Sequence, residues 1–405
     1  MTAQPGLSPR ERGRRDVVDI AHQAAINPAS AKHAATARAL VPLTAIEPGQ
    51  WRALAQRAVE PNGYYLPAWE LAVSATARGR TDASVLPAFD GSSTRLIGLM
   101  PVISLWRAWK IPLPAQVSAH PYGTLCSPLI DRDAPIKAAA HLLQQARAAG
   151  AHAVVLNDVA LDGAAMIALN QVLKRDGLKP RLLSSYIRAS LDATQDGETL
   201  LRDALGTKKL KELRRQRHRL EEHGAVVFDV ARSLDEIRPA LETFLQLEAS
   251  GWKGKRGTAL VQHAGDATFI RRAVPALAET AQCEIVTLRA GATPVAAGIV
   301  LRHQDRAFFF KLGIDERFAR YSPGVQLTLE LTRRLCADPA IATADSTASA
   351  DHPMINPIWR GRFAVGDVLI PLRRNDPIVA LVHGALAAHG IAYAAARRAV
   401  RLLRK

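Results

Sequence analysis

The stretch that most constrains the fold is residues 307–332, AFFFKLGIDERFARYSPGVQLTLELT. Its first part, AFFFKLGI, is aromatic or aliphatic apart from Lys311 and Gly313, which is typical of a central β-strand. A charged turn follows, and Ser322-Pro323 then predicts a helix start, because Ser is a common N-cap and Pro suits the first helical position. Such a strand–turn–helix leaves backbone N–H groups unpaired at the positive end of the helix dipole. The stretch therefore predicts an anion site suited to a pyrophosphate.

Two arginines, Arg317 and Arg320, flank the opening of this site. The Arg-Tyr-Ser-Pro-Gly turn between strand and helix resembles the acyl-CoA pyrophosphate motif of the GNAT acyltransferase superfamily, whose usual pattern is Arg/Gln-x-x-Gly-x-Gly/Ala. Arg320 fits this pattern, whereas Pro323 and Val325 hold the two small positions and Gly324 lies between them. The resemblance implies an acetyl-CoA or other acyl-CoA site formed by Arg317, Arg320, Tyr321, Ser322, Gly324 and Val325.

Together with a later Asp and Trp, the stretch looks most similar to the CelD-like (BcsL-type) acetyltransferases linked to polysaccharide synthesis, relatives of the FemABX aminoacyltransferases. This resemblance implies an α/β (α+β) fold of tandem GNAT-like domains, each a mixed, largely antiparallel sheet flanked by helices. Residues 95–104 and 294–303 support the idea of a repeat, because each apolar run precedes a Tyr and a Ser-Pro and then a helix. The first copy lacks the matching Arg, so we expect it to be structural or substrate-binding.

Composition and the positions of turn-forming residues divide the chain into four parts. Residues 1–40 are rich in Ala, Arg, Pro and Ser and are expected to be a disordered basic arm. Residues 41–195 are expected to be the N-terminal GNAT-like domain and 196–375 the acyltransferase domain. Residues 376–405 form a basic helical tail, expected either to dock on its own domain or to lie on an anionic membrane.

The three cysteines are far apart and form no disulfide or zinc spacing, which fits a reducing cytoplasm. The sequence lacks an apolar N-terminal region and a membrane-length apolar run, so we expect a cytoplasmic protein, with a peripheral place at the inner face of the membrane as a variant. Acyl transfer of this kind needs no metal, and none is expected.

A second informative stretch is EASGWKG at residues 248–254. Trp252 offers a flat apolar wall and Lys253 a cation beside it, which suits a sugar or nucleotide ring next to a charged group. The alternative is a Trp that fills the core below a loop. The CelD-like family has a similar Ser-Gly-Trp-Lys-Gly loop, which favours substrate binding.

The segment DSTASADH at residues 345–352 follows a predicted strand end, where ligands of open α/β folds bind. Asp345, Asp351 and His352 are therefore candidates for the general base, although the aspartates equally suit caps or turns. The resemblance suggests that Trp359 closes the acceptor side.

Three further side chains have candidate roles in the same domain. Lys311, an unusual cation within a strand, is expected to pair with Asp345 or to orient a substrate carboxylate or phosphate. Tyr321 is expected either to protonate a leaving thiolate or to pack at the helix start. Glu284 is a weaker base candidate.

The net charge of +16 is concentrated in the arm, in the tail and in a basic helix predicted at residues 208–222. That helix is expected to dock through Leu210, Leu213 and Leu220 while its cations hold tRNA, an anionic membrane or substrate phosphates, or are merely solvated. The resemblance to the CelD-like family implies an acyltransferase that acylates an amine or hydroxyl of a sugar or cell-envelope precursor. The alternatives are a Fem-like transferase that uses aminoacyl-tRNA and a non-catalytic component of polysaccharide assembly.

Overall fold

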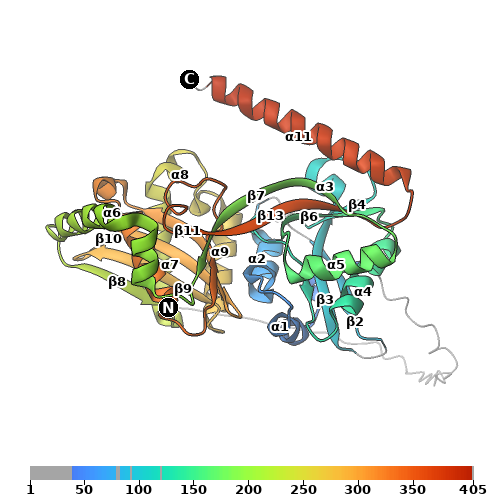
Figure 1. The fold of residues 1–405 in the computed structure, drawn as a ribbon, viewed down its shortest axis with the longest axis horizontal. Coiled ribbons are helices and arrows are strands. Elements are labelled where there is room, and N and C mark those ends of the chain that lie inside the picture. Colours follow the sequence, from blue (N-terminus) through green and yellow to red (C-terminus); the bar gives the residue numbers. More distant parts are fainter. Residues whose placement is uncertain (1–38, 79–82, 92–93, 119–120, 404–405) are drawn as a thin grey trace, which may run out of the picture. The chain divides into compact units, whose positions relative to one another are not determined.

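The described residues of the computed structural model, 39–405 without 79–82, 92–93, 119–120 and 404–405, build one mixed sheet of 13 strands (Figure 1). The predicted arm of residues 1–40 lies outside them except for its last two residues. The strands are β1 Val41–Pro42, β2 Ser84–Phe89, β3 Leu96–Ser104, β4 Ala115–Val117, β5 Leu129–Ile130, β6 Ala153–Ala160, β7 Arg181–Asp192, β8 Val226–Ala231, β9 Cys283–Ala290, β10 Thr293–His303, β11 Arg306–Ile314, β12 Thr343–Asp345 and β13 Gly361–Pro371.

Helices flank this sheet, as predicted. They are α1 Pro48–Gln56, α2 Pro67–Thr76, α3 Leu105–Trp109, α4 Pro135–Ala148, α5 Ala164–Arg175, α6 Gly197–Glu221, α7 Leu234–Ser250, α8 Trp252–Lys255, α9 Ala264–Ala278, α10 Pro323–Cys336 and α11 Pro377–Leu403. Short 3-10 helices cover Leu43–Ala45, Gly63–Tyr65, Leu260–Gln262 and Glu316–Tyr321.

The strand order reveals the predicted repeat. It runs β1-β2-β3-β4-β6-β13-β7-β12-β11-β10-β9-β8, so β2-β3-β4-β6 in the first half corresponds to β9-β10-β11-β12 in the second. In both halves the first three strands are antiparallel and the last pair, β4 with β6 or β11 with β12, is parallel. The predicted fold of two GNAT-like units is confirmed in this pattern.

The two central strands join the halves into a continuous sheet. The last strand, β13, returns from the second half and pairs antiparallel with β6 of the first, with Val365 opposite Ala160. On its other side β13 pairs with β7, which in turn pairs with β12. The C-terminal strand is therefore a structural part of both repeats.

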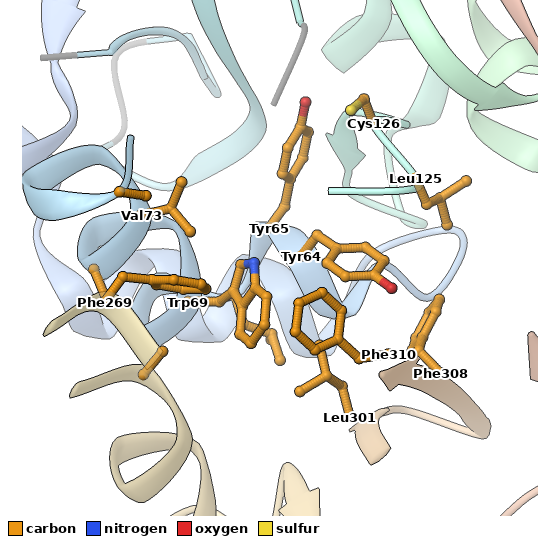
Figure 2. Packing of buried hydrophobic residues seen from close by; sticks show 14 of the residues in the cluster. Tyr64, Tyr65, Trp69, Val73, Leu125, Cys126, Phe269, Leu301, Phe308 and Phe310 are labelled. Atoms are coloured by element: carbon orange, nitrogen blue, oxygen red, sulfur yellow. The ribbon is translucent and has the colours of Figure 1, made fainter. Parts of the chain in front are cut away.

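An aromatic cluster packs the second half against the first (Figure 2). Trp69 of α2 meets Phe269 of α9 and Phe310 of β11 edge to face, at centroid distances of 4.9 and 4.8 Å. Tyr64 meets Phe308 of β11 in the same way at 5.6 Å. Such pairs contribute roughly 0.5–1.5 kcal/mol each beyond the burial of their area. The cluster fixes β11, the strand that was predicted from residues 307–314.

The basic segment forms the second part of α6, which breaks at Gly206, where φ is 71° and ψ is 163°. Leu210, Leu213 and Leu220 are buried, so the predicted docking face is confirmed. Lys208, Lys211 and Arg214 are exposed on the same helix.

The predicted tail is a single helix, α11, of which the first turns pack on the fold. Its residues Pro377–Ala396 are long and apolar enough to cross a membrane, with a mean hydropathy of 1.6, and only 11% of that window is buried. This corrects the expectation that the sequence has no apolar run of membrane length. Docking on its own domain, the alternative given to the tail by its sequence, applies to the part of the helix up to His389, whose ring lies 5.9 Å from that of Trp109.

Candidate active site

A pocket opens where β11 and β12 part. The two strands pair in parallel only from Arg306–Thr343 to Phe308–Asp345. Beyond this point residues 309–312 line one side of the pocket and residues 346–348 the other, enclosing a volume of about 510 Å³. The strand edge of β11 facing the pocket consequently has no strand partner among the described residues.

A bulge in β11 marks the same place. Ile299 of β10 lies opposite Lys311 and the next residue, Val300, lies opposite Phe309, so Phe310 is an extra residue on β11. Bulges bend a strand and redirect its side chains, and they are common beside binding sites. The hydroxyl of Thr347 donates to the carbonyl of Phe309 at 2.7 Å and holds the facing wall in place.

The N-terminus of α10 forms the end of the pocket, where Ser322, Pro323, Gly324 and Val325 line it. Ser322 occupies the predicted N-cap position, but its backbone is left-handed (φ 54°) and its side chain makes no capping bond. Within the described chain no group accepts from the amides of Gly324 and Val325. Unpaired amides and the helix dipole give this end the properties that suit an anion.

Gly324 allows α10 to lie close to β11. A Cβ at this position would come within 3.0 Å of a Leu312 methyl, 3.3 Å of an Ile314 methyl and 3.4 Å of the Met354 sulfur. A side chain here would push the helix start away from the strand, so the glycine keeps the free amides beside β11.

Two lysines and one glutamate form a charged group at the pocket. The Nζ atoms of Lys253 and Lys311 both lie 3.2 Å from Oε1 of Glu248, and Lys253 also donates to the carbonyl of Leu312 at 3.0 Å. Burial, followed by the charge of Lys311, lowers the pKa of Lys253. Glu248 is 2% exposed and its Oε2 accepts from the amide of Leu260. One carboxylate thus balances two cations, which favours an anionic group on the ligand.

Trp252 lies at the mouth of the pocket with 51% of its surface exposed. It starts the short helix α8, and Arg256 of the next turn lies 5.1 Å from its ring centroid. The alternative of a Trp that fills the core is therefore excluded, and a flat apolar surface is available to a ligand.

His352 is the predicted base that lines the pocket. It is half-buried, and burial lowers its pKa below the ordinary value. Its ring is therefore neutral near pH 7 and able to accept a proton. Nδ1 lies 3.5 Å from the amide of Ile355, which orients the ring only weakly.

The arginines and tyrosine of the turn face elsewhere. Arg317, Arg320 and Tyr321 line a neighbouring cavity of about 250 Å³ together with His223. Arg317 pairs with Asp315 at 2.7 Å, and the Arg320 guanidinium lies 4.7 Å from the ring centroid of Tyr321.

The phenol of Tyr321 hydrogen-bonds to Nε2 of His223 at 3.0 Å, and the tyrosine is buried. Of the predicted donor-site residues the main pocket therefore gathers Ser322, Gly324 and Val325.

Asp345 lies in a buried ion pair. Its Oδ2 is 2.5 Å from Nη2 of Arg188, and the two side chains are 2% and 0% exposed. The expected pairing of Lys311 with Asp345 is corrected, because Lys311 binds Glu248 and Asp345 binds Arg188. Asp345 also accepts a hydrogen bond from the amide of Thr347 at 2.9 Å, so it holds residues 346–348, one wall of the pocket, in position.

The remaining two predicted residues also lie outside the pocket. Asp351 is exposed, has a left-handed backbone (φ 55°), and lies on the surface near Arg360. Trp359 is completely buried and donates its indole N–H to the hydroxyl of Thr332 at 2.9 Å. This corrects the expectation that Trp359 closes the acceptor side, because a fully buried ring in the core cannot contact an acceptor.

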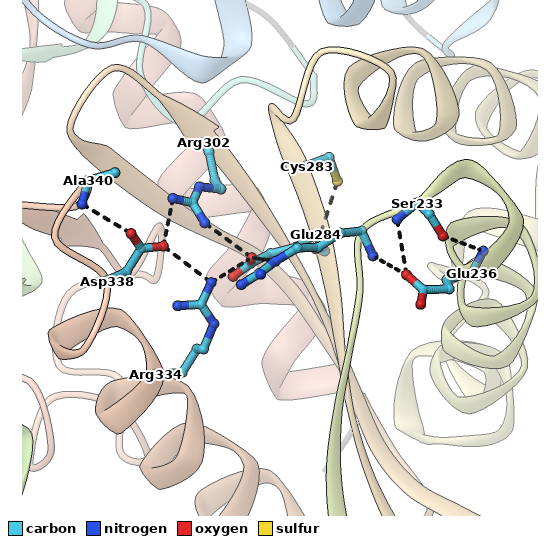
Figure 3. A network of polar contacts seen from close by, with 9 residues as sticks. Ser233, Glu236, Cys283, Glu284, Arg302, Arg334, Asp338 and Ala340 are labelled. Carbon is cyan, nitrogen blue, oxygen red and sulfur yellow. Dashed lines mark hydrogen bonds and ion pairs between the residues drawn. The ribbon is translucent and has the colours of Figure 1, made fainter.

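Glu284 is surrounded by arginines (Figure 3). Its Oε2 lies 3.2, 3.3 and 3.5 Å from Arg232, Arg302 and Arg334, and its side chain is 1% exposed. Arg302 and Arg334 also hold Asp338, at 2.8 and 3.2 Å. This network joins β9, β10 and α10 outside the pocket, so the expectation of Glu284 as a base is corrected to a structural role.

Sequence reasoning missed two residues that shape the site. Glu248 was visible only as the first residue of the stretch before Trp252, and nothing local indicated that both lysines would reach it. Arg188 lies within β7, and several other strands also contain arginines, so no local signal distinguished it. No group of three or more His, Cys, Asp or Glu side chains in the described ranges has the arrangement of a metal site.

Comparison with known proteins agrees with this geometry. Residues 207–352 match the family model described as an acetyltransferase (GNAT) domain, a range that holds β11, α10, β12 and His352. The fold is similar to that of FemX, with a TM-score of 0.53, 13% identity, and coverage of 84% of this chain and 98% of that one. It is also similar to the C-terminal domain of a putative lysylphosphatidylglycerol synthetase from Agrobacterium fabrum, with a TM-score of 0.51, 12% identity, and coverage of 84% and 95%. No curated protein matches the chain.

Proposed function

We propose that the chain is an acyltransferase that moves an acyl group from acyl-CoA to an amine or hydroxyl of a sugar or cell-envelope precursor. The observation that carries this proposal is the pocket between the diverging strands β11 and β12. The N-terminus of α10, whose first amides have no acceptor within the described chain, forms one end of this pocket. The GNAT family match covers both walls and the helix, and that fold generally binds acyl-CoA.

The donor would bind along β11 and α10. The free amides of Gly324 and Val325 and the helix dipole suit the pyrophosphate. The edge of β11 that lacks a strand partner suits an extended amide-bearing arm, which can add to a strand through main-chain hydrogen bonds. Arg317 and Arg320 remain proposed as outer phosphate contacts, since they line the adjoining cavity.

The acceptor would lie toward Trp252, Lys253 and Lys311. An exposed indole suits the flat face of a sugar or base, and the surplus cation suits a phosphate or carboxylate beside it. This arrangement favours a charged sugar derivative, such as a nucleotide-linked or lipid-linked precursor, over a neutral one.

His352 would act as the general base. The acceptor amine or hydroxyl attacks the thioester carbonyl and its proton passes to His352. The C–S bond then breaks, and the thiolate leaves as a thiol by taking the proton back from His352. Holding both reactants in one pocket contributes most to such a reaction, and a positioned base adds roughly 10²–10⁴-fold. Asp351 and Asp345 are weaker candidates, because one is exposed outside the pocket and the other is held by Arg188. Tyr321, bonded to His223, would reach a leaving thiolate only if the donor extends toward its cavity.

Calorimetric titration with acetyl-CoA, desulfo-CoA, adenosine diphosphate and a longer acyl-CoA tests the donor. Binding that requires the pyrophosphate and strengthens with the acyl arm is expected. Absence of binding to all four would reject acyl-CoA as the donor. Binding without turnover on any amine or hydroxyl sugar would instead favour the non-catalytic component of polysaccharide assembly.

The base is tested by His352→Gln beside Asp351→Asn. We expect the first substitution to lower kcat by roughly 10²–10⁴-fold with unchanged donor affinity, and the second to change kcat little. Because the pKa of His352 is lowered, the midpoint of the fall in kcat/KM with decreasing pH should lie below 6.5. Equal, small losses in both variants would exclude His352.

A Fem-like transfer from aminoacyl-tRNA is the second candidate. The observation favouring it is the position of α6, whose exposed cations lie on a helix that packs against α10 and the 3-10 helix Glu316–Tyr321 beside the pocket. A tRNA backbone held there would bring its acylated end near the site. Titration with aminoacyl-tRNA, with Lys208, Lys211 and Arg214 changed to Gln, decides between the donors. A loss of RNA binding confined to low salt is expected if the cations hold the backbone.

A further inference from the structure

The helix α11 begins on the fold and then leaves it (Figure 1). Val379 and Val382 are 3% and 0% exposed and belong to the core, and the ring of His389 lies 5.9 Å from that of Trp109. From residue 390 to residue 396 every side chain is exposed, including Ile391 at 72% and Tyr393 at 60%. The helix is thus tied down at its start and uncovered afterwards.

The uncovered part is apolar around its whole circumference. Residues Pro377–Ala396 contain no Asp, Glu, Lys or Arg and have a mean hydropathy of 1.6. A soluble helix with such a composition is normally buried, yet only 11% of this window is. An export signal precedes the domain that it exports, whereas α11 follows the fold. The exposed surface therefore requires a partner.

The cations at the end of the helix indicate what that partner is. Arg397, Arg398, Arg401, Arg404 and Lys405 follow the apolar part, and no acidic residue occurs from residue 377 onward. A second copy of this helix packed in parallel would bring two sets of five like charges together, and a nucleic acid would leave the apolar surface uncovered. An anionic lipid bilayer satisfies both features, since apolar residues enter its interface and cations bind its headgroups.

The length of the free segment decides how it binds. Only residues 390–396 lie between the docked part of the helix and the first cation, Arg397, and at 1.5 Å per residue they extend about 10 Å, which is shorter than the roughly 30 Å hydrocarbon core of a bilayer. A complete span would have to pull Val379 and Val382 out of the core. We propose that α11 keeps its docked first turns, lies in the interface of an anionic membrane, inserts the apolar residues 390–396 into one leaflet and binds the lipid headgroups through Arg397, Arg398 and Arg401.

Flotation of the full chain with vesicles tests this inference, which does not depend on the reaction proposed above. Vesicles of phosphatidylcholine alone are compared with vesicles of equal parts phosphatidylcholine and phosphatidylglycerol. We expect recovery only with the anionic vesicles. Equal recovery with both would overturn the assignment to an anionic surface, and no recovery would overturn membrane binding.

Two pairs of variants separate the apolar from the charged contribution. Ile391→Glu with Tyr393→Glu should reduce partitioning at least about tenfold, whereas Ile167→Glu, at a 52% exposed site on α5, should not. Arg397, Arg398 and Arg401 changed to Gln should reduce it roughly 100-fold at low salt, whereas Lys208, Lys211 and Arg214 of α6 changed to Gln should not. If the α11 variants float like the parent chain, another surface binds the lipid and the inference fails.

Sedimentation of the parent chain without lipid tests whether a second copy of the chain, rather than a membrane, binds α11. A monomer is expected. A dimer that Ile391→Glu with Tyr393→Glu dissociates, in a protein that does not float, would assign α11 to a second copy and overturn the proposal.

Discussion

Both repeats contain a short pair of parallel strands that diverge at one end, but the space beyond the pair differs between them. In the first repeat β4 pairs in parallel with β6 over Ala115–Val117, as β11 does with β12 in the second. Beyond β4, however, the chain fills the gap. The amide of Asn157 donates to the hydroxyl of Ser118 at 3.0 Å, and the amide of Ala160 donates to that of Ser127.

The connection to the following helix explains this difference. Residues 118–134 separate β4 from α4 and include β5, which pairs with β3. Only residues 315–322 separate β11 from α10, and most of them form one 3-10 helix. The short connection leaves the gap open and points the start of α10 into it. The same sheet therefore provides one repeat in which this gap is filled and one in which it is an open pocket.

Arg188 links the filled repeat to the open one, and its removal should have the largest effect. It donates to the carbonyl of Thr124 at 2.7 Å, in the segment between β4 and α4, and it pairs with Asp345 at the end of β12. Arg188→Met leaves the Asp345 charge buried and unpaired, so the free energy of unfolding should fall by roughly 3–5 kcal/mol in urea denaturation.

Arg271→Met, which breaks an exposed pair with Glu242, is the matched control and should cost about 1 kcal/mol or less. Arg188→Met combined with Asp345→Leu should recover much of the loss, because no lone buried charge remains. A loss no larger than that of the control would contradict the linking role.

His303 should make the contact between the repeats sensitive to pH. At the end of β10 its ring accepts from the amide of Asn62 and bonds to the carbonyl of Ala55, and burial lowers its pKa to about 4. Because the unfolded pKa is about 6.5, the stabilisation is complete above that pH and is lost as the pH falls toward 4. Unfolding at pH 5 should cost about 2 kcal/mol less than at pH 7.

Urea titrations across this range test the prediction. His303→Gln should remove most of the dependence, whereas His218→Gln, at an exposed position of α6, should leave it intact. An unchanged slope in the first variant would assign the pH dependence to other groups.

Gly324→Ala should change the start of α10 beside the pocket, where the two repeats differ. The added methyl group presses on Leu312 and Ile314, moves the first turn of α10 and should weaken donor binding about tenfold in calorimetry. Gly98→Ala is the matched control in the first repeat, where a Cβ would lie 3.0 Å from Ala88 and 3.1 Å from Leu142. Both variants should lose stability by overpacking, but only the first should lose affinity. Equal affinities would count against the helix start as the donor site.

Arg320→Glu should have the smallest effect. Arg320 is exposed and lines the adjoining cavity rather than the main pocket, so donor affinity should fall less than about tenfold and only at low salt. Arg271→Glu, on α9, is the control for general charge. A salt-independent loss much larger than this would place Arg320 in direct contact with the pyrophosphate, as its motif predicts.

Local pattern identified the parts of the site that are continuous in sequence. β11, its turn and α10 follow from residues 307–332, because strand composition, a Ser-Pro helix start and a glycine are all local signals. Trp252, Lys253 and His352 were likewise visible as unusual residues in loops. These side chains come together because β11, α8 and the segment after β12 meet at one edge of the sheet.

Pairings between distant residues could not be derived in this way. Lys311 was expected to bind Asp345, yet the nearest available carboxylate is that of Glu248 on α7, and Asp345 is held by Arg188 on β7. Trp359 looked like an acceptor wall but belongs to the core. Which partner a charged or aromatic side chain finds depends on sheet order, to which no local pattern is sensitive.

The sequence by itself determined many of the elements and the doubled plan, and it predicted an anion site at one helix start, since these depend on neighbours within a few turns of chain. Only the tertiary structure decided that one gap is filled and the other open, and that α11 leaves the fold after its first turns. The physical reason is that burial and ion pairing are set by residues far apart in sequence, whose contacts exist only once β7 and β13 have joined the two halves of the sheet.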